Sequence, residues 1–399
     1  MRVLVLAEFY PSRRDPVLGI WAHRQALAAR DAGAEVRVMV LHRLVPPRAA
    51  LASGPRAAAA ALAGLAREPR QQVRDGLEVS YVPYVSPDRQ RSYAQWGAWA
   101  TPTLAVAMAR LHRSFPFELV HAHNAVPAGD AVRRVRALRA VRAPLVISVH
   151  GGDVLYTAGR MRSGEQIVRG ALAEARLVLA NSEGIAELAK AHGARETRVV
   201  HLGTDIPTAA RPLRRSGTAP TLVTVAHLVA RKRHADVLRA LAVLTPRHPT
   251  LRYTIIGAGP ERAALQLLAE RLEVSERVEF CGQLAHEQAV ELARRCTLFV
   301  MPSTEEAFGV AYVEAMAGGV PAIGCRGEPG PEEIAAAGDG LVLVPPGDIE
   351  RLTQRIDELL SDPHRLHEAR QRARATVAAS FTWEHCARQT IDAYEHALL

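Results

Sequence analysis

The sequence predicts an α/β protein built from two doubly wound parallel sheets. A chain of 399 residues is longer than one ordinary hydrophobic core requires, so two domains are expected. Short apolar runs alternate with helix patterns in two separate series, which is typical of parallel strands joined by crossover helices. A stretch rich in proline and arginine, residues 206–219, separates the two series and predicts the domain boundary.

The first series opens with the apolar run Val3–Ala7, which predicts a central strand. A helix pattern follows from Ile20 to Ala32 and ends at Gly33, and residues 36–41 begin the next strand. The loop at residues 9–19 therefore lies at the carboxyl end of the first strand, the edge where open α/β sheets bind ligands.

Two later strands of this series end in histidines. Residues 119–123 contain His121 and His123, and residues 145–150 end in His150, which Gly151 and Gly152 follow. Glycines directly after a strand allow another molecule to approach the backbone, and a histidine there can donate to a hydroxyl or an oxyanion. A buried structural role is the alternative for all three histidines.

The second series opens with a strand at 222–226, and a helix runs to about Leu244. Arg231, Lys232 and Arg233 lie between them, at a strand end and beside a helix start. Cations in this position suit a diphosphate whose charge must be neutralised. The alternative is a solvated basic turn.

The stretch from Ser303 to Ile323 is the most informative part of the chain. It follows a buried strand, and Glu306 and Glu314 flank the expected helix start, with Phe308-Gly309 between them. Free N–H groups at a helix start favour anions, and carboxylates accept hydrogen bonds from hydroxyls. A nucleotide sugar offers both an anionic diphosphate and hydroxyl groups. A helix cap at Glu306 and a solvated Glu314 remain the alternative.

Glu306-x7-Glu314, with Phe-Gly inside and Glu-Ala-Met-Ala-x-Gly-x-Pro following, resembles the retaining glycosyltransferases of family 4. This resemblance implies the GT-B fold, two Rossmann-like domains that face a central cleft. It also implies that Glu306 contacts the hydroxyls of the donor sugar and that Glu314 contacts the ribose. The resemblance extends over nearly the whole chain and is strongest from Arg231 to Asp348.

Other segments carry further residues of the family pattern. His150-Gly-Gly-Asp153 resembles His-Gly-x-Asp, and Lys232 keeps its place although Ala226-His227 replaces the usual Gly-Arg. The resemblance implies catalytic roles for His150, Lys232 and Glu306. The residues that it implies for donor binding are Gly19, Arg231, Lys232, Gly282, Phe308, Gly309 and Glu314.

Phe381-Thr-Trp resembles the closing segment of the family, in which the last helix returns to the first domain. The domains implied are therefore an acceptor domain, 1–205 with the helix 382–399, and a donor domain, 206–381. We find no Asp-x-Asp signature at a strand end and no carboxylate placed as a nucleophile. We expect a metal-independent reaction with no cofactor besides the donor substrate.

Composition is that of an ordinary globular protein, with 48% hydrophobic and 23% charged residues. The net charge of +9 favours anionic partners. The first apolar run is too short for a signal peptide, and no window approaches the roughly 18 apolar residues of a spanning helix. Four cysteines without metal spacing fit a reducing compartment. We expect a cytoplasmic location.

Residues 46–75 are rich in Ala, Arg and Pro, and 57–67 predict a helix. This segment is either a surface insertion or a contact with an anionic membrane surface. Trp96 and Trp99, on an expected helix at 91–113, are interpreted first as core residues and second as acceptor contacts.

The leading hypothesis is a retaining glycosyltransferase that uses a nucleotide-sugar donor and a glycan or lipid-linked acceptor, with no nucleic acid partner. The loop at 10–20 looks like that of cell-wall polysaccharide transferases, which favours a UDP-sugar. The alternatives are a GT-B-fold nucleotide-sugar epimerase and a non-catalytic nucleotide-sugar-binding partner. A dehydrogenase is disfavoured because no Gly-x-Gly-x-x-Gly follows the first strand.

Overall fold

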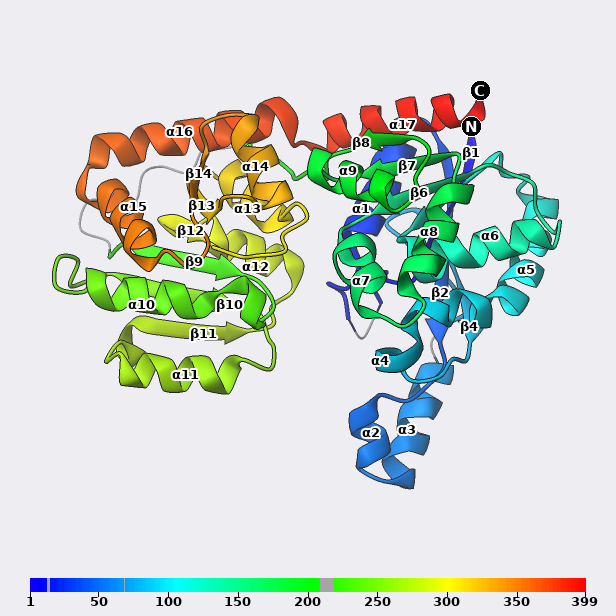
Figure 1. Ribbon diagram of the computed structural model, residues 1–399, viewed down its shortest axis with the longest axis horizontal. Coiled ribbons are helices and arrows are strands. Elements are labelled where there is room, and N and C mark those ends of the chain that lie inside the picture. The colour runs from blue at the N-terminus through cyan, green and yellow to red at the C-terminus, as the bar shows by residue number, and fades with distance from the viewer. Residues whose placement is uncertain (13–14, 68, 209–218) are drawn as a thin grey trace. The chain divides into compact units, whose positions relative to one another are not determined.

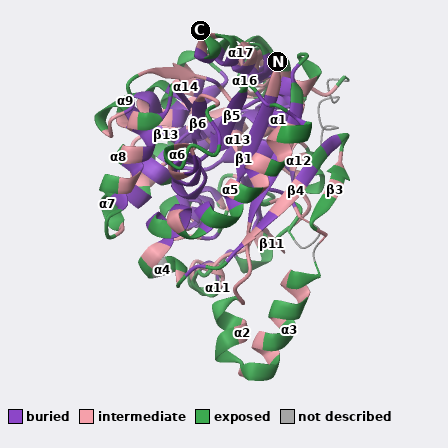
Figure 2. Ribbon diagram, turned by 90° about the vertical axis from the view of Figure 1, so that its right-hand side faces the viewer, coloured by how far each residue is buried: buried purple, intermediate pink, exposed green. Residues whose placement is uncertain are grey.

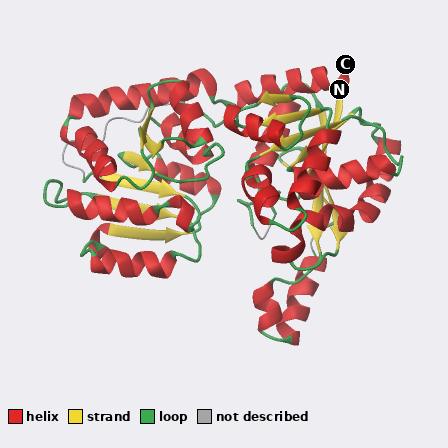
Figure 3. Cartoon of the chain, viewed as in Figure 1, coloured by secondary structure: helices red, strands yellow, loops and turns green. Residues whose placement is uncertain are grey.

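The structure is a computed structural model that describes residues 1–12, 15–67, 69–208 and 219–399. The chain divides into two compact units, unit 1 with Met1–Val200 and Cys386–Leu399, and unit 2 with His201–His385. Each unit holds its own sheet flanked by helices (Figure 1, Figure 3). The predicted class, two doubly wound sheets, is confirmed. Most of the expected boundary stretch, residues 209–218, lies outside the described residues.

Unit 1 contains an eight-stranded sheet in the order β3-β4-β2-β1-β5-β6-β7-β8. All neighbours are parallel except β3 and β4, which pair antiparallel at one edge. The strands are β1 (Arg2–Ala7), β2 (Glu35–Arg43), β3 (Gln71–Arg74), β4 (Leu77–Tyr84), β5 (Leu119–His123), β6 (Leu145–Val149), β7 (Leu177–Ala180) and β8 (Thr197–Val199). The chain leaves β1 toward β2 and later returns to the other side of β1 as β5. The switch point of this sheet therefore lies between β1 and β5.

Unit 2 contains a six-stranded parallel sheet in the order β11-β10-β9-β12-β13-β14. Its strands are β9 (Thr221–Val225), β10 (Arg252–Ile256), β11 (Val278–Gly282), β12 (Leu298–Val300), β13 (Ala322–Cys325) and β14 (Leu341–Val344). Its helices are α10 (His234–Leu244), α11 (Arg262–Arg271), α12 (His286–Ala293), α13 (Val310–Ala317), α14 (Pro329–Ala336), α15 (Ile349–Ser361) and α16 (Pro363–Ser380). Fully buried Leu, Ile, Val and Tyr side chains from the strands and from α10 form its core. The switch point lies between β9 and β12.

Most helices of unit 1 flank its sheet (Figure 1). The helices of unit 1 are α1 (Ile20–Asp31), α2 (Arg48–Ala52), α3 (Pro55–Ala66), α4 (Arg89–Ser92), α5 (Trp96–Ser114), α6 (Asp130–Ala137), α7 (Ala158–Arg160), α8 (Gly164–Glu174), α9 (Glu183–Ala191) and most of α17 (Trp383–Leu398). Trp96 is buried, as expected, whereas Trp99 is 51% exposed. Trp99 was expected first in the core, and this interpretation is wrong because its position on α5 faces solvent.

Helices α2 and α3 contain no buried residue and project from the rest of unit 1 (Figure 1, Figure 2). The helix expected at 57–67 is thus present as α3. It follows Gly54 and begins at Pro55, which suits the first helical position. Among the described residues, no helix has both the length and the apolar character needed to cross a membrane.

Candidate active site

A buried ion pair lies at the switch point of unit 2. Lys232 ends a short 3-10 turn after β9, and Glu306 lies in the loop between β12 and α13. Because β9 and β12 are adjacent parallel strands, both loops emerge at the same edge of the sheet. Lys232 Nζ donates to Glu306 Oε2, and the two residues are only 9% and 7% exposed. The two residues expected to be catalytic in this unit are therefore in direct contact.

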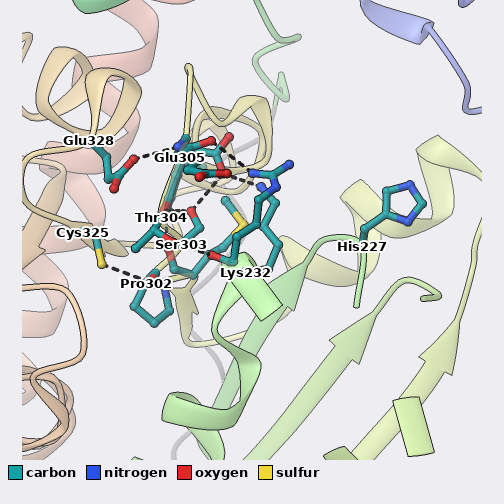
Figure 4. Close-up of polar contacts among 12 residues, drawn as sticks. His227, Lys232, Pro302, Ser303, Thr304, Glu305, Cys325 and Glu328 are labelled. Atoms are coloured by element: carbon teal, nitrogen blue, oxygen red, sulfur yellow. Dashed lines mark hydrogen bonds and ion pairs between the residues drawn. The ribbon is translucent and has the colours of Figure 1, made fainter. Parts of the chain in front are cut away.

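Further hydrogen bonds fix the orientation of Glu306. Ser303 Oγ donates to Glu306 Oε2 at 2.9 Å, and the Glu306 N–H donates to Glu328 Oε2 at 2.8 Å (Figure 4). Burial acts to raise the pKa of Glu306, but the charges of Lys232 and Arg231 and the hydrogen bonds outweigh it, so the pKa is lowered. Glu306 is thus held as a carboxylate at neutral pH.

Arg231 connects the same two loops at the surface. Its carbonyl oxygen accepts from the Thr304 N–H at 2.8 Å, and its Nη1 donates to the Glu305 carbonyl oxygen at 3.2 Å. The residue remains exposed. It is therefore the cation beside the buried pair that an anionic ligand can reach most directly.

The Phe308-Gly309 turn that begins α13 is tightly packed. Gly309 has φ +85°, and a Cβ there would lie 2.4 Å from the Tyr312 ring. A Cβ on Gly330, at the start of α14, would lie 2.2 Å from Phe308 Cα. Phe308 itself is buried, and the Tyr312 hydroxyl donates to the Met301 carbonyl oxygen. Only glycine at these two positions lets α13 and α14 approach the loop that carries Glu306.

Glu314, on α13, contacts a histidine of α12. Its Oε1 lies 3.2 Å from His286 Nε2 of α12, and its carbonyl oxygen accepts from Arg294 Nε at 2.9 Å. The Glu314 side chain is 13% exposed. The structure thus places Glu306 and Glu314 in separate polar contacts, and the contact of Glu314 with a ribose remains a prediction.

The glycines near β10 and β11 allow loops of unit 2 to pack closely against one another. A Cβ on Gly259 would lie 2.4 Å from the Leu228 carbonyl oxygen, so this glycine lets the loop after β9 pack closely. Gly282 ends β11 with φ +72°, and its carbonyl oxygen accepts from the Gly257 N–H at 2.8 Å. The exposed His227 lies apart from Lys232, and its Nδ1 lies 3.1 Å from the Ala258 carbonyl oxygen (Figure 4).

In unit 1, the half-buried His150 lies against the buried His123. Its Nε2 lies 3.0 Å from Nδ1 of His123, the last residue of β5, and the two rings are stacked. Burial lowers the pKa of His150 to about 4, so the ring is neutral at pH 7. His121 instead contacts Tyr394 of α17 and Ser148, each at 2.7 Å. His121 is therefore a structural residue that fastens α17 to the sheet.

Unit 1 also holds two buried carboxyl groups, Asp153 and Glu8, whose charges act on each other. Asp153 Oδ1 accepts from the Val126 N–H at 3.2 Å, and burial raises the pKa of Asp153 to about 7. Glu8 accepts from the Tyr93 hydroxyl at 2.7 Å, and Arg89 lies 3.5 Å from its other oxygen. Burial also raises the pKa of Glu8. Sequence reasoning did not single out Glu8, whose position directly after β1 was the available signal.

Gly19 precedes α1 with φ +72°, and a Cβ there would lie 2.1 Å from the Phe9 carbonyl oxygen. A backbone contact within the loop therefore requires this glycine, and its contact with donor phosphates remains a prediction. Among the described residues, no group of three or more His, Cys, Asp or Glu side chains is arranged to hold a metal ion. Metal independence likewise remains a prediction.

Family models match both halves of the chain. Residues 205–376 match "Glycosyl transferases group 1", and residues 18–207 match "Glycosyltransferase Family 4". The chain therefore belongs to the family 4, group 1 glycosyltransferases.

Two curated relatives match parts of the chain. An exopolysaccharide phosphotransferase of Streptomyces coelicolor is 33% identical over 56% of this chain, a match that spans 24% of that protein. A GDP-mannose-dependent monoacylated alpha-(1-6)-phosphatidylinositol monomannoside mannosyltransferase of Corynebacterium glutamicum is 28% identical over 71% of this chain and 78% of its own length.

Solved structures share the fold over nearly the whole chain. Sucrose-phosphate synthase from Thermosynechococcus elongatus has a TM-score of 0.76 and 21% identity, with 99% of this chain and 98% of that chain covered. HepE from Anabaena, solved with UDP, has a TM-score of 0.72 and 20% identity, with 99% and 100% covered. The GT-B fold implied by the sequence is confirmed.

Proposed function

We propose that this chain transfers a sugar, with retention of anomeric configuration, from a nucleoside-diphosphate sugar to a glycan or lipid-linked acceptor in the synthesis of cell-envelope polysaccharide or glycolipid. The observation that carries the proposal is the Lys232 and Glu306 pair with Arg231 beside it. It lies at the sheet edge where open α/β folds bind nucleotides. Family membership supports the same reaction class.

The residues of unit 2 suit the stabilisation of a departing diphosphate. Arg231 is exposed and cationic, and the N-terminus of α13 lies at the end of the Glu306 loop. Both favour negative charge. Glu306 keeps Lys232 in place, and its carboxylate is engaged by Lys232 and Ser303, so it is not positioned as a free nucleophile.

The proposed step therefore needs no covalent intermediate. The bond between the anomeric carbon and the diphosphate oxygen breaks, and the acceptor oxygen bonds to the same face of that carbon. The acceptor proton passes to an oxygen of the departing β-phosphate. The cations named above stabilise the charge that develops there without a metal ion or a cofactor.

We propose a UDP-sugar as the first candidate donor, which the UDP complex of HepE supports. GDP-mannose is the second candidate, because several curated relatives are named GDP-mannose-dependent. A thermal-shift panel of UDP-, GDP- and ADP-sugars tests the choice. A donor at 100 times its Kd stabilises the fold by about 2.7 kcal/mol, so the correct base should stand out. No shift with any of the three would contradict the proposal.

An epimerase and a non-catalytic binding partner remain the alternatives. Incubation of the chain with the donor that stabilises it separates them. An epimerase converts the sugar while the nucleotide stays attached, and a binding partner releases no nucleotide. A glycosyltransferase releases free nucleoside diphosphate when an acceptor is supplied.

We further propose that the protein works in the cytoplasm, at the inner face of the cell membrane, through α2 and α3. Residues 46–67 contain Arg48, Arg56 and Arg67 and no acidic residue, and Leu51 and Leu62 are exposed. Basic and apolar side chains on a projecting helix suit an anionic lipid surface. The protein should sediment with phosphatidylglycerol vesicles but not with phosphatidylcholine vesicles. This binding should be lost when the three arginines are replaced by glutamate. Equal sedimentation with both lipids would contradict this.

A further inference from the structure

The loop that carries Glu306 contains a residue in the left-handed region of backbone space. Glu305 has φ +54°, a conformation that is disfavoured roughly fivefold to thirtyfold for a residue with a side chain. Such a conformation persists only where the surrounding contacts hold it. Because Glu305 directly precedes Glu306, its bend sets the direction in which the Glu306 side chain points. The contacts that hold Glu305 therefore act on the buried pair of Glu306 and Lys232.

The turn after β9 holds one side of this loop. The Thr304 N–H donates to the carbonyl oxygen of Arg231 at 2.8 Å, and Arg231 Nη1 donates to the carbonyl oxygen of Glu305 at 3.2 Å. These two bonds fix the peptide groups on either side of the bend. The N–H group of Glu306 has a different partner.

The start of α14 holds the other side of the loop. Glu328, the residue before this helix, accepts from the Glu306 N–H through Oε2 at 2.8 Å (Figure 4). The Gly330 N–H, one of the first N–H groups of α14 and therefore without an acceptor inside the helix, donates to the Glu306 carbonyl oxygen at 3.1 Å. Both polar groups of the Glu306 backbone are thus bonded at the start of α14.

The half-buried Glu328 engages the bend itself and not only Glu306. Burial raises the pKa of Glu328, while the backbone N–H groups of Glu306 and Glu305 act in the opposite direction. A left-handed residue can turn successive N–H groups to the same side, where they hold an anion. Hydrogen bonds to an ionised acceptor are about twice as strong as neutral ones. The carboxylate of Glu328 therefore offsets the cost of the bend at Glu305.

We propose that Glu328 is a positioning residue that holds Glu305 in its left-handed conformation and so directs the Glu306 carboxylate to Lys232. Glu328 acts through the shape of the loop, because its carboxylate is bonded to the backbone of the loop. The effect on catalysis rests on the proposed function, in which Lys232 and Glu306 serve sugar transfer. The effect on the loop does not depend on that function.

Amide hydrogen exchange of the full chain tests the effect on the loop. Glu328→Ala removes the acceptor, so a peptide that covers residues 303–309 should exchange about tenfold faster. Glu328→Gln keeps a side-chain oxygen that accepts from the Glu306 N–H, and its exchange should stay within about threefold of that of the unaltered protein. Unchanged exchange in Glu328→Ala would overturn the proposal whatever the function proves to be.

Glu332 provides the matched control, because it forms the same kind of bond in the first turn of α14. Its Oε1 accepts from the Gly327 N–H at 2.8 Å, away from the loop that carries Glu306. Glu332→Ala should leave the exchange of residues 303–309 unchanged. Faster exchange there in Glu332→Ala would show that any loss in this turn loosens the loop, and it would refute a specific role for Glu328.

Kinetics with the donor found by thermal shift provide the second readout. Glu328→Ala should lower kcat by about tenfold and leave KM for the donor within about twofold, because the exposed Arg231 is retained. Glu328→Gln should recover most of this loss, and a loss of more than about tenfold in Glu328→Gln would overturn the proposal even if Glu328→Ala fails to fold. A lower KM in Glu328→Ala would also overturn it, because the carboxylate would then compete with the donor for the N–H groups.

A glycine at position 305 separates the bend from any direct action of the Glu328 charge. Glycine adopts a positive φ without steric cost, so Glu305→Gly should raise kcat of the Glu328→Ala protein by about threefold or more. A double variant as slow as Glu328→Ala would refute the positioning role. An unchanged kcat in Glu306→Gln would instead refute the function proposed for Glu306, and the exchange data would still decide how Glu328 acts on the loop.

Discussion

Removing Lys232 should destabilise unit 2 as well as impair turnover. Glu306 is 7% exposed, so Lys232→Met leaves a buried carboxylate without its main counter-charge. Removing one partner of a buried pair costs about 3–5 kcal/mol, and we expect about 3 kcal/mol because Ser303 and Arg231 still act on Glu306. Lys232→Met combined with Glu306→Gln removes both charges and should lie within about 1 kcal/mol of the unaltered protein.

The sign of the pH dependence follows from the lowered pKa of Glu306. In the unaltered protein, the contribution of the pair is present above the unfolded pKa of Glu306 and is lost as the pH falls through the lower folded pKa. In Lys232→Met the carboxylate is unpaired, so the destabilisation should be largest near pH 8 and should shrink as the pH falls and Glu306 takes up a proton.

The assay is urea unfolding followed by circular dichroism, with amide hydrogen exchange of α10 and α13 to identify the transition of unit 2. Lys190→Met is the control, because Lys190 forms an exposed pair with Glu187 in unit 1 and its removal should leave the transition of unit 2 unchanged. The argument would be refuted if the free energy of unfolding of Lys232→Met lay within about 0.5 kcal/mol of that of the unaltered protein. It would also be refuted if the stability change of the double variant equalled the sum of the changes in the two single variants.

Three further predictions follow from other sites. The raised pKa of Asp153 means that the unaltered protein loses stability as the pH rises from 4 to 7. Asp153→Asn should remove this loss and raise the free energy of unfolding at pH 8 by up to about 4 kcal/mol, as measured by urea unfolding at each pH. An unchanged slope would contradict this. Gly309→Ala should destabilise unit 2 by about 1–3 kcal/mol, because its Cβ meets the Tyr312 ring. Gly54→Ala is the control, because Gly54 also has a positive φ but no atom lies near its Cβ. Equal losses of stability in the two variants would show that the contact with Tyr312 adds no cost. EDTA should leave the rate of sugar transfer unchanged, and a loss that Mg²⁺ or Mn²⁺ restores would show that the reaction needs a metal.

The strands were the most predictable part of the fold. The run Leu177–Ala180 is wholly apolar, because parallel strands are covered on both faces, and the structure has a strand with these bounds. Helix α9 begins with a cap that depends on residues only three positions apart, in which Ser182 Oγ accepts from the Ile185 N–H at 3.3 Å. The polar edge strand β3 carries no such apolar run, and its pairing with β4 was not foreseen.

The sequence indicated candidate residues for the site, but it did not indicate which of them are in contact. Lys232 and Glu306 are 74 positions apart, so no local pattern could show that they form a buried pair. The sequence predicted a cluster of three cations, Arg231, Lys232 and Arg233, and the structure buries Lys232 and leaves Arg231 exposed. His123 and His150 are 27 positions apart and meet only because β5 and β6 are adjacent in the sheet. Spacing along one strand or helix gives no information on such contacts.

The stereochemistry of sugar transfer tests the central claim most directly. The unaltered chain is incubated with the α-linked nucleotide sugar that stabilises it, and ¹H NMR follows the anomeric signals of the sugar before mutarotation, whether it goes to an acceptor or to water. Retention at a site without a free nucleophile predicts that the α-anomer forms first and that Glu306→Gln suppresses its formation. A β-anomer as the first product would contradict the retaining mechanism. The proposed glycosyl transfer itself would be contradicted if no tested donor released sugar or nucleotide in the presence of acceptor glycans.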